Sequence, residues 1–242
     1  FAIIRENLED LYLGLEGPID DLSALNLFAP HARSSLKDLG PGRYAIKAIT
    51  EAGAERVIRF AFELARKRGG QRKVTLTSKY NMLHQSDGLF REIGRSIADE
   101  YSDIEFETFI VDDFLCRMIT QPDALDVVVT PNLYGDILSD GAAGLIGGLG
   151  LAPSGCFGAD YAYFESAHGT APDIQGMNAI NPTATLLSAG MMLEYLGLED
   201  AARALKNAVS ATFKEGQNLT PDQGGTATTT DFCNSVRLHL GI

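Results

Sequence analysis

IEFETFIVDDFLCRMITQPDALDVVVTPNLYGDILSD, residues 104–140, holds the pattern that decides the fold. An apolar strand-like run at 104–113 leads into an amphipathic segment with helical spacing at 113–122, and a second apolar run follows at 125–131. Strands that alternate with helices are typical of a mainly parallel α/β sheet. We therefore predict strand, helix and strand here, with an apolar, glycine-rich helix after them.

The same alternation extends outward from this stretch in both directions. Three prolines between Gly17 and Gly42 interrupt it and indicate an extended loop or arm there. The other predicted elements are strands at 1–7 and 73–78, helices at 49–70, 87–103, 183–197 and 199–216, and a last helix within 220–240 that its Thr run caps.

Composition limits the class of protein. The chain has 242 residues, 45% apolar and 21% charged, as in an ordinary globular protein of one or two domains. Its net charge of -12 argues against nucleic acid as a partner, and no apolar run reaches the ~18 residues of a membrane helix. The opening FAIIREN lacks both Met and a basic signal segment, so we expect that the beginning of the protein is missing.

Three scattered cysteines, Cys116, Cys156 and Cys233, argue against a disulfide framework or a zinc cluster. We expect three buried thiols without chemistry. They favour a reducing compartment, the cytoplasm or, in a eukaryotic cell, the mitochondrial matrix.

Two acids, Asp136 and Asp140, stand at the front of a run that is otherwise small, apolar or glycine. At a spacing of four residues they share one face of a helix, where two like charges repel unless a cation lies between them. Oxygen ligands suit Mg²⁺ or Mn²⁺. Alternatively, Asp136 caps the helix and Asp140 is solvated. Asp112 and Asp113 end the strand at 104–113, at the sheet edge where open α/β folds bind ligands.

Several motifs together resemble a family, the β-decarboxylating dehydrogenases of isocitrate, homoisocitrate and 3-isopropylmalate. The resemblance runs from Arg5 to about Thr229. It implies two α/β domains that share a mainly parallel sheet core, distinct from a classical Rossmann fold. The motifs are NLYGDILSD (132–140), VDDFLCRMI (111–119), GLAPSG (150–155) and AHGTAPDIQGMNAINPTA (167–184), with RENLEDLYLG (5–14) and SKYN (78–81).

The resemblance also implies a domain arrangement. Residues 1–146 would form the smaller, dimer-forming domain, with the arm at about 17–42. Residues 147–242 would be the C-terminal part of the larger cofactor-binding domain, and the N-terminal part of a family member would be absent. A homodimer or higher homo-oligomer with shared active sites follows from the same resemblance.

Site residues carry over motif by motif. Asp136 and Asp140, with the partner's Asp112, would hold Mg²⁺ or Mn²⁺, which polarises the substrate hydroxyl as a Lewis acid. Arg5 would clamp a substrate carboxylate and Tyr12 would be the proton donor. The remaining residues of this set are Lys79, which would assist proton removal across the dimer interface, Asn81, which would bind substrate, and Tyr80, which is bulky where family members usually carry a small residue.

Cofactor residues are implied around the loop at 168–181. GLIGGLGLAPSG lacks the strand, G-x-G-x-x-G, helix order of a Rossmann site. A carboxylate at Asp173 accepts from ribose hydroxyls and repels a 2′-phosphate, which favours NAD over NADP. The implied residues are Glu165 near the nicotinamide, His168 and Asn181 at the adenine, Gly169, Thr170 and Ala171 near the phosphates, and Asp173 and Ile174 where the choice of cofactor is made.

The predicted activity is NAD-dependent oxidative decarboxylation of a malate-type 2-hydroxy acid. REN and PNLYGD favour isocitrate, which would become 2-oxoglutarate, over homoisocitrate and then 3-isopropylmalate. A non-catalytic regulatory subunit of the same fold is the alternative from another class, and it should have lost Tyr12, Lys79 or one of the metal acids. A plain α/β module whose acids are caps is the third reading. The expected partner is a small hydroxy di- or tricarboxylate, with no nucleic acid and no membrane.

Overall fold

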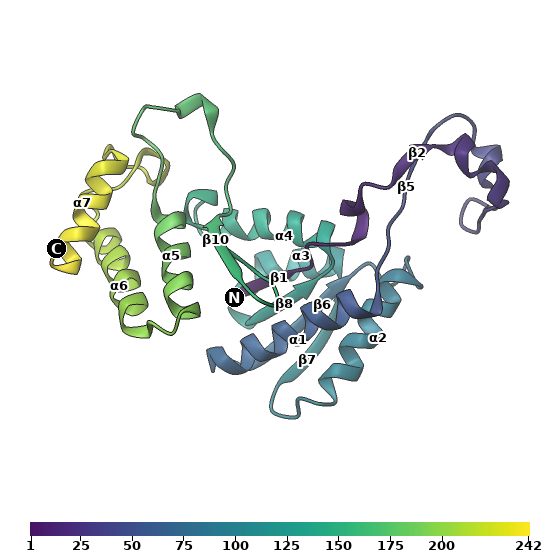
Figure 1. Ribbon diagram of the computed structural model, residues 1–242, viewed down its shortest axis with the longest axis horizontal. Coiled ribbons are helices and arrows are strands. Elements are labelled where there is room, and N and C mark those ends of the chain that lie inside the picture. The colour runs from purple at the N-terminus through teal and green to yellow at the C-terminus, as the bar shows by residue number, and fades with distance from the viewer. The chain divides into compact units, whose positions relative to one another are not determined.

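The computed structural model describes residues 1–242, which form two compact units, Phe1–Ser139 and Asp140–Ile242 (Figure 1). Helix α4 (Asn132–Leu145) runs across the division between them. The assignment of a dimer-forming domain to 1–146 and a cofactor-binding domain to 147–242 stays a prediction.

Four parallel strands form the sheet of the first unit, in the order β1-β8-β6-β7 (Figure 1). All four residues of β8 are buried, as expected for an inner strand of a parallel sheet. Ile3 pairs with Val128, and Leu76 pairs with Val129. The strands are β1 (Ala2–Arg5), β6 (Lys73–Ser78), β7 (Glu105–Ile110) and β8 (Val127–Thr130), which confirms the predicted parallel α/β sheet.

Helices α1 (Glu51–Arg68) and α2 (Ser86–Ala98) pack on one face of this sheet, where Phe62 and Phe90 join the same core cluster as Leu76. Thr50 begins α1 by accepting a hydrogen bond from the Gly53 backbone N–H, and Gly69 ends it in the left-handed conformation that glycine tolerates best. Helix α3 (Val111–Thr120) contacts β6 and β7, buries Phe114 and Met118, and is followed by the 3₁₀ turn η4 (Pro122–Ala124).

Two element boundaries differ from the predictions at the predicted site. Strand β7 ends at Ile110, so Asp112 and Asp113 lie in the first turn of α3 rather than at the end of a strand. Carboxylates are favourable there because the helix N-terminus carries a partial positive charge. Helix α4 begins at Asn132, which places Asp136 in its second turn. Asp136 is therefore not a helix cap, so that part of the alternative is wrong, whereas Asp140 is exposed as the alternative expects.

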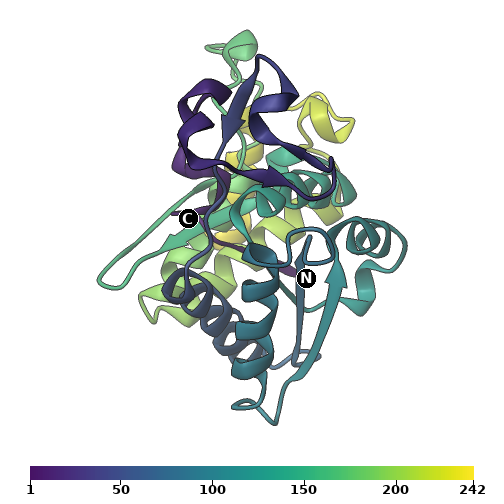
Figure 2. The same cartoon turned by 90° about the vertical axis from the view of Figure 1, so that its right-hand side faces the viewer.

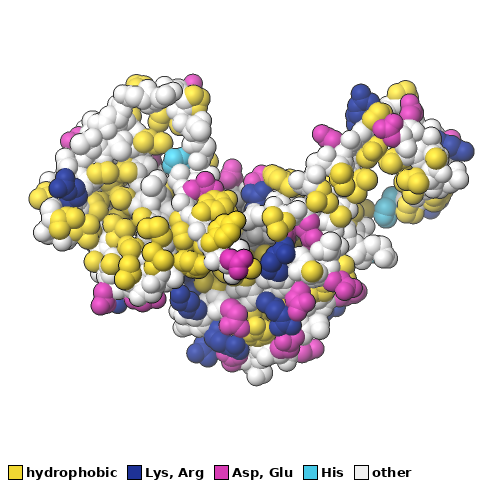
Figure 3. Space-filling view, viewed as in Figure 1, with side chains coloured by type: hydrophobic (Ala, Val, Ile, Leu, Met, Phe, Trp, Pro, Cys, Tyr) yellow, Lys and Arg dark blue, Asp and Glu magenta, His cyan; other side chains and the backbone are white.

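The predicted arm is present, but it is not a plain loop. After η1 (Asp10–Leu13) the chain leaves the sheet as an antiparallel ladder of β2 and β5, which Figure 2 shows most clearly. Every residue from Glu16 to Ala45 is exposed or only partly buried, and apolar side chains lie uncovered on the arm (Figure 3). Leu25 is 61% exposed and Phe28 is 63% exposed. The arm comprises β2 (Glu16–Pro18), η2 (Ile19–Leu25), β3 (Phe28–Ala29), β4 (Ser34–Ser35), η3 (Leu36–Leu39) and β5 (Arg43–Ala45).

The second unit combines a β-hairpin with three helices. Phe232 and Val209 are buried in its core, and the Phe213 and Phe232 rings lie 5.4 Å apart. The Ser188 hydroxyl ties α5 to the hairpin, since it donates to the Glu165 carbonyl at 2.6 Å. The elements are η5 (Leu149–Leu151), β9 (Pro153–Phe157), β10 (Ala162–Ser166), η6 (Pro172–Ile174), α5 (Thr183–Tyr195), α6 (Glu199–Glu215), η7 (Pro221–Gln223) and α7 (Thr229–Leu240).

The three cysteines are free, as predicted, but the expectation that all three are buried is wrong. Cys116 is exposed, because α3 turns Phe114 and Met118 inward instead, and Cys156 and Cys233 are partly buried. Burial raises the pKa of the Cys233 thiol above its usual value. None of the helices combines the length and the apolar character needed to cross a membrane.

Candidate functional site

The carboxyl edge of the parallel sheet gathers polar side chains from all four strands. Arg5 is the last residue of β1, and Lys79 directly follows β6. Asp112 follows β7 by two residues, and Asn132 follows β8 by two. Because parallel strands end at the same edge, four chain segments present charged or amide groups there.

One cluster joins Arg5, Tyr12 and Asp136. Arg5 Nη1 donates to Asp136 Oδ1 at 2.5 Å, and the Tyr12 hydroxyl donates to Asp136 Oδ2 at 2.7 Å. The guanidinium carbon of Arg5 lies 5.0 Å from the centre of the Tyr12 ring. The residues implied as carboxylate clamp, proton donor and metal ligand are thus brought together.

The electrostatics of this cluster keep the Tyr12 phenol protonated. Its hydrogen bond to Asp136 raises the pKa of Tyr12 above the ordinary value, burial and the negative charge of Asp136 act in the same direction, and Arg5 opposes them. A phenol with a raised pKa is neutral at physiological pH. Tyr12 therefore has a proton to give.

Gly135 makes room for Arg5 beside α4. A Cβ atom at position 135 would lie 2.5 Å from Arg5 Cγ and 2.8 Å from Arg5 Cβ, closer than packed atoms approach. Glycine is unfavourable inside a helix. Its presence in α4 is explained by the close passage of the Arg5 side chain.

A second cluster pairs Lys79 with Asp112. Lys79 Nζ forms an ion pair with Asp112 Oδ1, and this hydrogen bond is the main cause that lowers the pKa of Asp112 below its usual value. The side chains are 31% and 67% exposed, so the pair is accessible from solvent. The Lys79 backbone N–H donates to Asp87 Oδ2 at 2.7 Å, which fixes the chain where the lysine leaves the strand.

Other predicted residues stand apart from both clusters. Asn81 is exposed in the turn after β6, and Arg91 lies 4.3 Å from the centre of the Tyr80 ring, which directs that ring toward α2. Asp113 pairs with Arg117 at 2.8 Å as an exposed ion pair. Asp140 is exposed one helical turn after Asp136 on α4.

The chain by itself contains no group of three or more His, Cys, Asp or Glu side chains that could hold a metal ion. Helix α4 carries two of the implied acids one turn apart, and Asp112 lies on α3, paired with Lys79. Carboxylate oxygens are the ligands that Mg²⁺ and Mn²⁺ prefer. The two acids on α4 therefore offer suitable donors for part of the coordination shell of such an ion.

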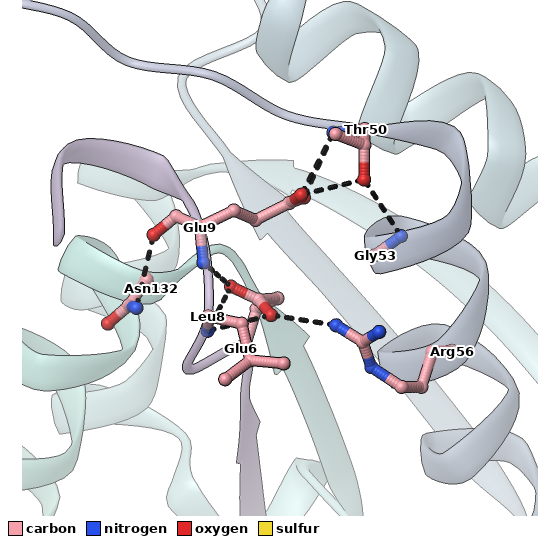
Figure 4. Close-up of polar contacts among 7 residues, drawn as sticks. All are labelled: Glu6, Leu8, Glu9, Thr50, Gly53, Arg56 and Asn132. Atoms are coloured by element: carbon pink, nitrogen blue, oxygen red, sulfur yellow. Dashed lines mark hydrogen bonds and ion pairs between the residues drawn. The ribbon is translucent and has the colours of Figure 1, made fainter. Parts of the chain in front are cut away.

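Buried acids hold the Arg5 segment in place (Figure 4). The Glu9 carboxylate accepts hydrogen bonds from the backbone N–H of Thr50, at 3.0 Å, and from its hydroxyl, at 2.7 Å, at the start of α1. The Glu9 carbonyl accepts from Asn132 Nδ2 at 3.2 Å, and Asn132 Oδ1 accepts from Arg5 Nε and Nη2 at 3.0 and 2.8 Å. The motif RENLEDLYLG did not reveal Glu9 as a support, because its partner lies 41 residues away.

Glu6 supports the same segment (Figure 4). Its buried carboxylate accepts from the backbone N–H groups of Leu8 and Glu9 and pairs with Arg56 of α1 at 3.1 Å. A buried carboxylate is costly unless it is paired and hydrogen-bonded, and both conditions are met here. The turn that leads to Tyr12 is thereby tied to α1.

The implied cofactor residues lie in the second unit. Glu165 is exposed on β10, and Asp173 is exposed on η6. Ala171 has a left-handed backbone with φ 45°, which is uncommon for a residue other than glycine. His168 Nδ1 lies 2.9 Å from the Gly169 carbonyl oxygen. Thr170 is exposed and Ile174 is partly buried, so together with Gly169 they complete an open loop at 168–174.

Asn181 has a structural role that the sequence did not predict. It is buried, its Oδ1 accepts from the Thr183 backbone N–H at 3.0 Å, and its Nδ2 donates to Asp222 at 3.0 Å. The amide thus joins the start of α5 to η7. Its predicted contact with the adenine would have to use the remaining N–H or the second lone pair of the same amide.

A polar, charge-paired edge on a four-stranded parallel sheet defines a class, the α/β proteins that bind ligands at the carboxyl ends of their strands. Residues 1–236 match the isocitrate/isopropylmalate dehydrogenase family, and the chain belongs to that family. Its predicted family and fold are confirmed.

Individual relatives show how far the similarity extends. The 3-isopropylmalate/3-methylmalate dehydrogenase of Methanocaldococcus jannaschii is 44% identical over 98% of this chain and 66% of that protein. The mitochondrial isocitrate dehydrogenase [NAD] subunit alpha of Macaca fascicularis is 45% identical over 96% of this chain and 62% of that protein. The chain therefore spans about two thirds or less of the length of these relatives.

A solved structure agrees with the sequence comparison. The isocitrate dehydrogenase from Methylococcus capsulatus superposes with a TM-score of 0.85 at 41% identity, over 98% of this chain and 66% of that one. The first two relatives are both dehydrogenases by name, one of 3-isopropylmalate and 3-methylmalate and the other of isocitrate.

Proposed function

We propose that the protein is an NAD-dependent dehydrogenase that oxidises the hydroxyl group of a malate-type 2-hydroxy acid and releases its β-carboxylate as CO₂. The observation that carries the proposal is the cluster in which Asp136 accepts hydrogen bonds from both Arg5 and Tyr12. It joins a carboxylate-binding cation, a protonated phenol and an acid at one edge of the sheet. Membership of the family supports the reaction class.

Three residues, Arg5, Lys79 and Tyr12, would each have a separate role in this reaction. The Arg5 guanidinium binds a substrate carboxylate. Lys79, as the neutral amine, would take the proton of the substrate hydroxyl. NAD, when bound, would accept the hydride, which gives a 2-oxo acid and NADH. Loss of CO₂ from the β-carboxylate leaves an enolate, and the Tyr12 hydroxyl gives its proton to the carbon. The balance is hydroxy acid and NAD⁺ to oxo acid, CO₂ and NADH.

Asp136 and Asp140, with the partner's Asp112, would hold Mg²⁺ or Mn²⁺. When bound, the ion supplies Lewis-acid polarisation of the oxygen that is oxidised. The arrangement of the chain supports a site shared between two copies. One cluster contains Arg5, Tyr12 and Asp136. The second cluster is the pair of Lys79 and Asp112, which the site of the partner would use.

NAD is the proposed cofactor, bound through the loop at 168–181 with Asp173 near the ribose. The exposed carboxylate of Asp173 repels a 2′-phosphate, which supports NAD over NADP. The NAD-dependent subunit from Macaca fascicularis, named above, is in keeping with this choice. A cytoplasmic or mitochondrial location remains part of the proposal.

Isocitrate is the proposed first substrate, ahead of homoisocitrate and 3-isopropylmalate. The ranking rests on REN at 5–7 and PNLYGD at 131–136. Overall identity does not separate the candidates, because the isopropylmalate and isocitrate relatives are 44% and 45% identical.

The test is NADH formation by the full-length protein with Mg²⁺, NAD or NADP, and a panel of isocitrate, homoisocitrate, 3-isopropylmalate and 3-methylmalate. We expect reduction of NAD, fastest with isocitrate and much slower with NADP. No reduction with any of the four acids would overturn the dehydrogenase. Calorimetric binding of isocitrate without NADH formation would instead establish the regulatory subunit, although Tyr12, Lys79 and the three metal acids are all present.

A further inference from the structure

A buried ammonium group lies between two buried carboxylates behind the site. Lys47 follows β5, and its Nζ lies 2.6 Å from Asp87 Oδ1 and 3.3 Å from Asp10 Oδ1. Both acids are fully buried, and the lysine side chain is only 12% exposed. The Tyr134 ring lies 4.4 Å from the same Nζ as a cation–π partner.

Each of the two carboxylates also holds one part of the candidate site. Asp87 Oδ2 accepts from the Lys79 backbone N–H at 2.7 Å. Asp10 Oδ2 accepts from the Leu133 backbone N–H at 3.0 Å, in the first turn of α4, which carries Asp136. Lys47 thus stands between the segment that presents Lys79 and the helix that presents Asp136.

We propose that Lys47 is a positioning residue that sets the places of Lys79 and of the first turn of α4 through Asp87 and Asp10. The consequence for catalysis rests on the proposed function of Lys79 and Asp136. The cluster has two negative charges and one positive charge, all enclosed. Removal of the cation leaves two buried carboxylates facing each other without a counter-charge, which a buried site tolerates poorly.

Asp87 has to be a carboxylate for this arrangement. One of its oxygens, Oδ1, forms the ion pair with Lys47 Nζ, and the other, Oδ2, accepts a hydrogen bond from the Lys79 N–H. An asparagine offers one oxygen and one NH₂ group, so one of the two donors would face another donor. The same reasoning applies to Asp10. Its Oδ1 pairs with Lys47 and accepts from the Leu11 N–H, and its Oδ2 accepts from the Leu133 N–H.

The two backbone N–H groups are separate reporters for the two halves of this arrangement. Hydrogen–deuterium exchange of single amides, read by fragmentation mass spectrometry on the full-length protein, follows Lys79 and Leu133 independently. We expect Asp87→Asn to speed exchange at Lys79 by about tenfold and leave Leu133 unchanged. Asp10→Asn should speed exchange at Leu133 and leave Lys79 unchanged. Asparagine also tolerates the left-handed backbone at this position, φ 71°, so the substitution adds no backbone strain. Lys47→Met should speed exchange at both amides.

Lys73→Met is the matched control. Lys73 also bridges two carboxylates, Glu105 at 3.5 Å and Glu107 at 3.0 Å, and its side chain is 15% exposed, but it lies at the opposite end of β6. The Lys73→Met variant should leave amide exchange at Lys79 and Leu133 unchanged. Asp87→Asn keeps Lys47 paired with Asp10 and adds no uncompensated charge, so it tests the proposal even where Lys47→Met fails to fold.

The exchange result stands whether or not the protein oxidises a hydroxy acid. Unchanged exchange at Lys79 in Asp87→Asn, or an equal increase at all amides of β6, would overturn the positioning role. In an active protein, Asp87→Asn should lower kcat by about tenfold with little change in KM, since Lys79 acts in the chemical step. A loss confined to KM would overturn the catalytic consequence. Absence of activity in the unmutated protein would instead count against the proposed function alone.

Discussion

Gly135 decides where Arg5 can lie, because no side chain fits between α4 and the arginine stem. Gly135→Ala should displace the guanidinium from Asp136 while it adds a better helix former. We expect KM for the hydroxy acid to rise about tenfold to a hundredfold, as for other misplaced binding groups. Steady-state kinetics measure this. Gly144→Ala is the control, since a Cβ there meets nothing within 4 Å, and an equal KM in both variants would contradict the account.

Asp222 gives a pH-dependent prediction. Burial raises its pKa, but hydrogen bonds from Thr220, Asn181 and Gln223 outweigh burial and hold the pKa below the usual value. A carboxyl group whose pKa is lower in the folded than in the unfolded state stabilises the protein at pH values above the unfolded pKa, which is about 4. That stability is lost as the pH falls through the folded pKa. Asp222→Asn should therefore lower Tm at pH 7, and the Tm difference should shrink in acid.

Thermal unfolding of the Asp222 variant at several pH values checks this. Asp20→Asn, on the exposed arm, controls for the loss of one negative charge. A Tm difference that stays the same from neutral to acid pH would show that the ionised form of Asp222 contributes no stability.

At the scale of single residues, local motifs indicated groups that lie together, while their roles stay a prediction, and groups joined only by long-range contacts were not predicted. Arg5, Tyr12 and Asp136 were predicted from local motifs, and they lie in one cluster. Lys47 and Asp87 were not predicted, because each contacts groups far away in the chain and neither stands in a distinctive pattern. Tertiary partners of buried charges cannot be found from spacing alone.

At the scale of elements, the start of α1 depends on a carboxylate from outside the helix. A Cβ at Gly53 would lie 2.6 Å from the carboxyl atoms of Glu9, which itself binds Thr50. Gly53→Ala should thus destabilise the protein by about 1–3 kcal/mol through overpacking, although alanine favours helix by about 1 kcal/mol. Gly88→Ala in α2, where the nearest atom is 3.9 Å away, should be neutral or stabilising.

Denaturant unfolding of the two glycine variants makes the comparison. A Gly53→Ala variant as stable as Gly88→Ala would mean that Glu9 is free to move away from α1. In that case the support of the Arg5 segment described above would not hold.

Element types were predicted more reliably than element boundaries. The four parallel strands and the helices between them follow from strong apolar periodicity, and they are present. The hairpin β9 and β10 was not predicted, because PSGCF and AYFES are short and contain small and polar residues. The start of α4 at Asn132 was not predicted from PNLYGD.

At the scale of the whole molecule, one chain carries two separate polar clusters, and the proposed site needs residues of both. The first cluster is Arg5, Tyr12 and Asp136, and the second is Lys79 with Asp112. No group of three metal-binding side chains forms within a single chain. If two copies complete each other's sites, a copy with a substitution in the first cluster and a copy with a substitution in the second should together form one intact site.

Mixed dimers of Tyr12→Phe and Lys79→Met test the central claim most directly. Each variant alone should be inactive in NADH formation. When both are co-expressed, half of the dimers contain one copy of each, and one of the two sites in such a dimer carries no lesion. We therefore expect about a quarter of the unmutated activity. Recovery to that level is the predicted result, and a mixture as inactive as the separate variants would contradict the shared site.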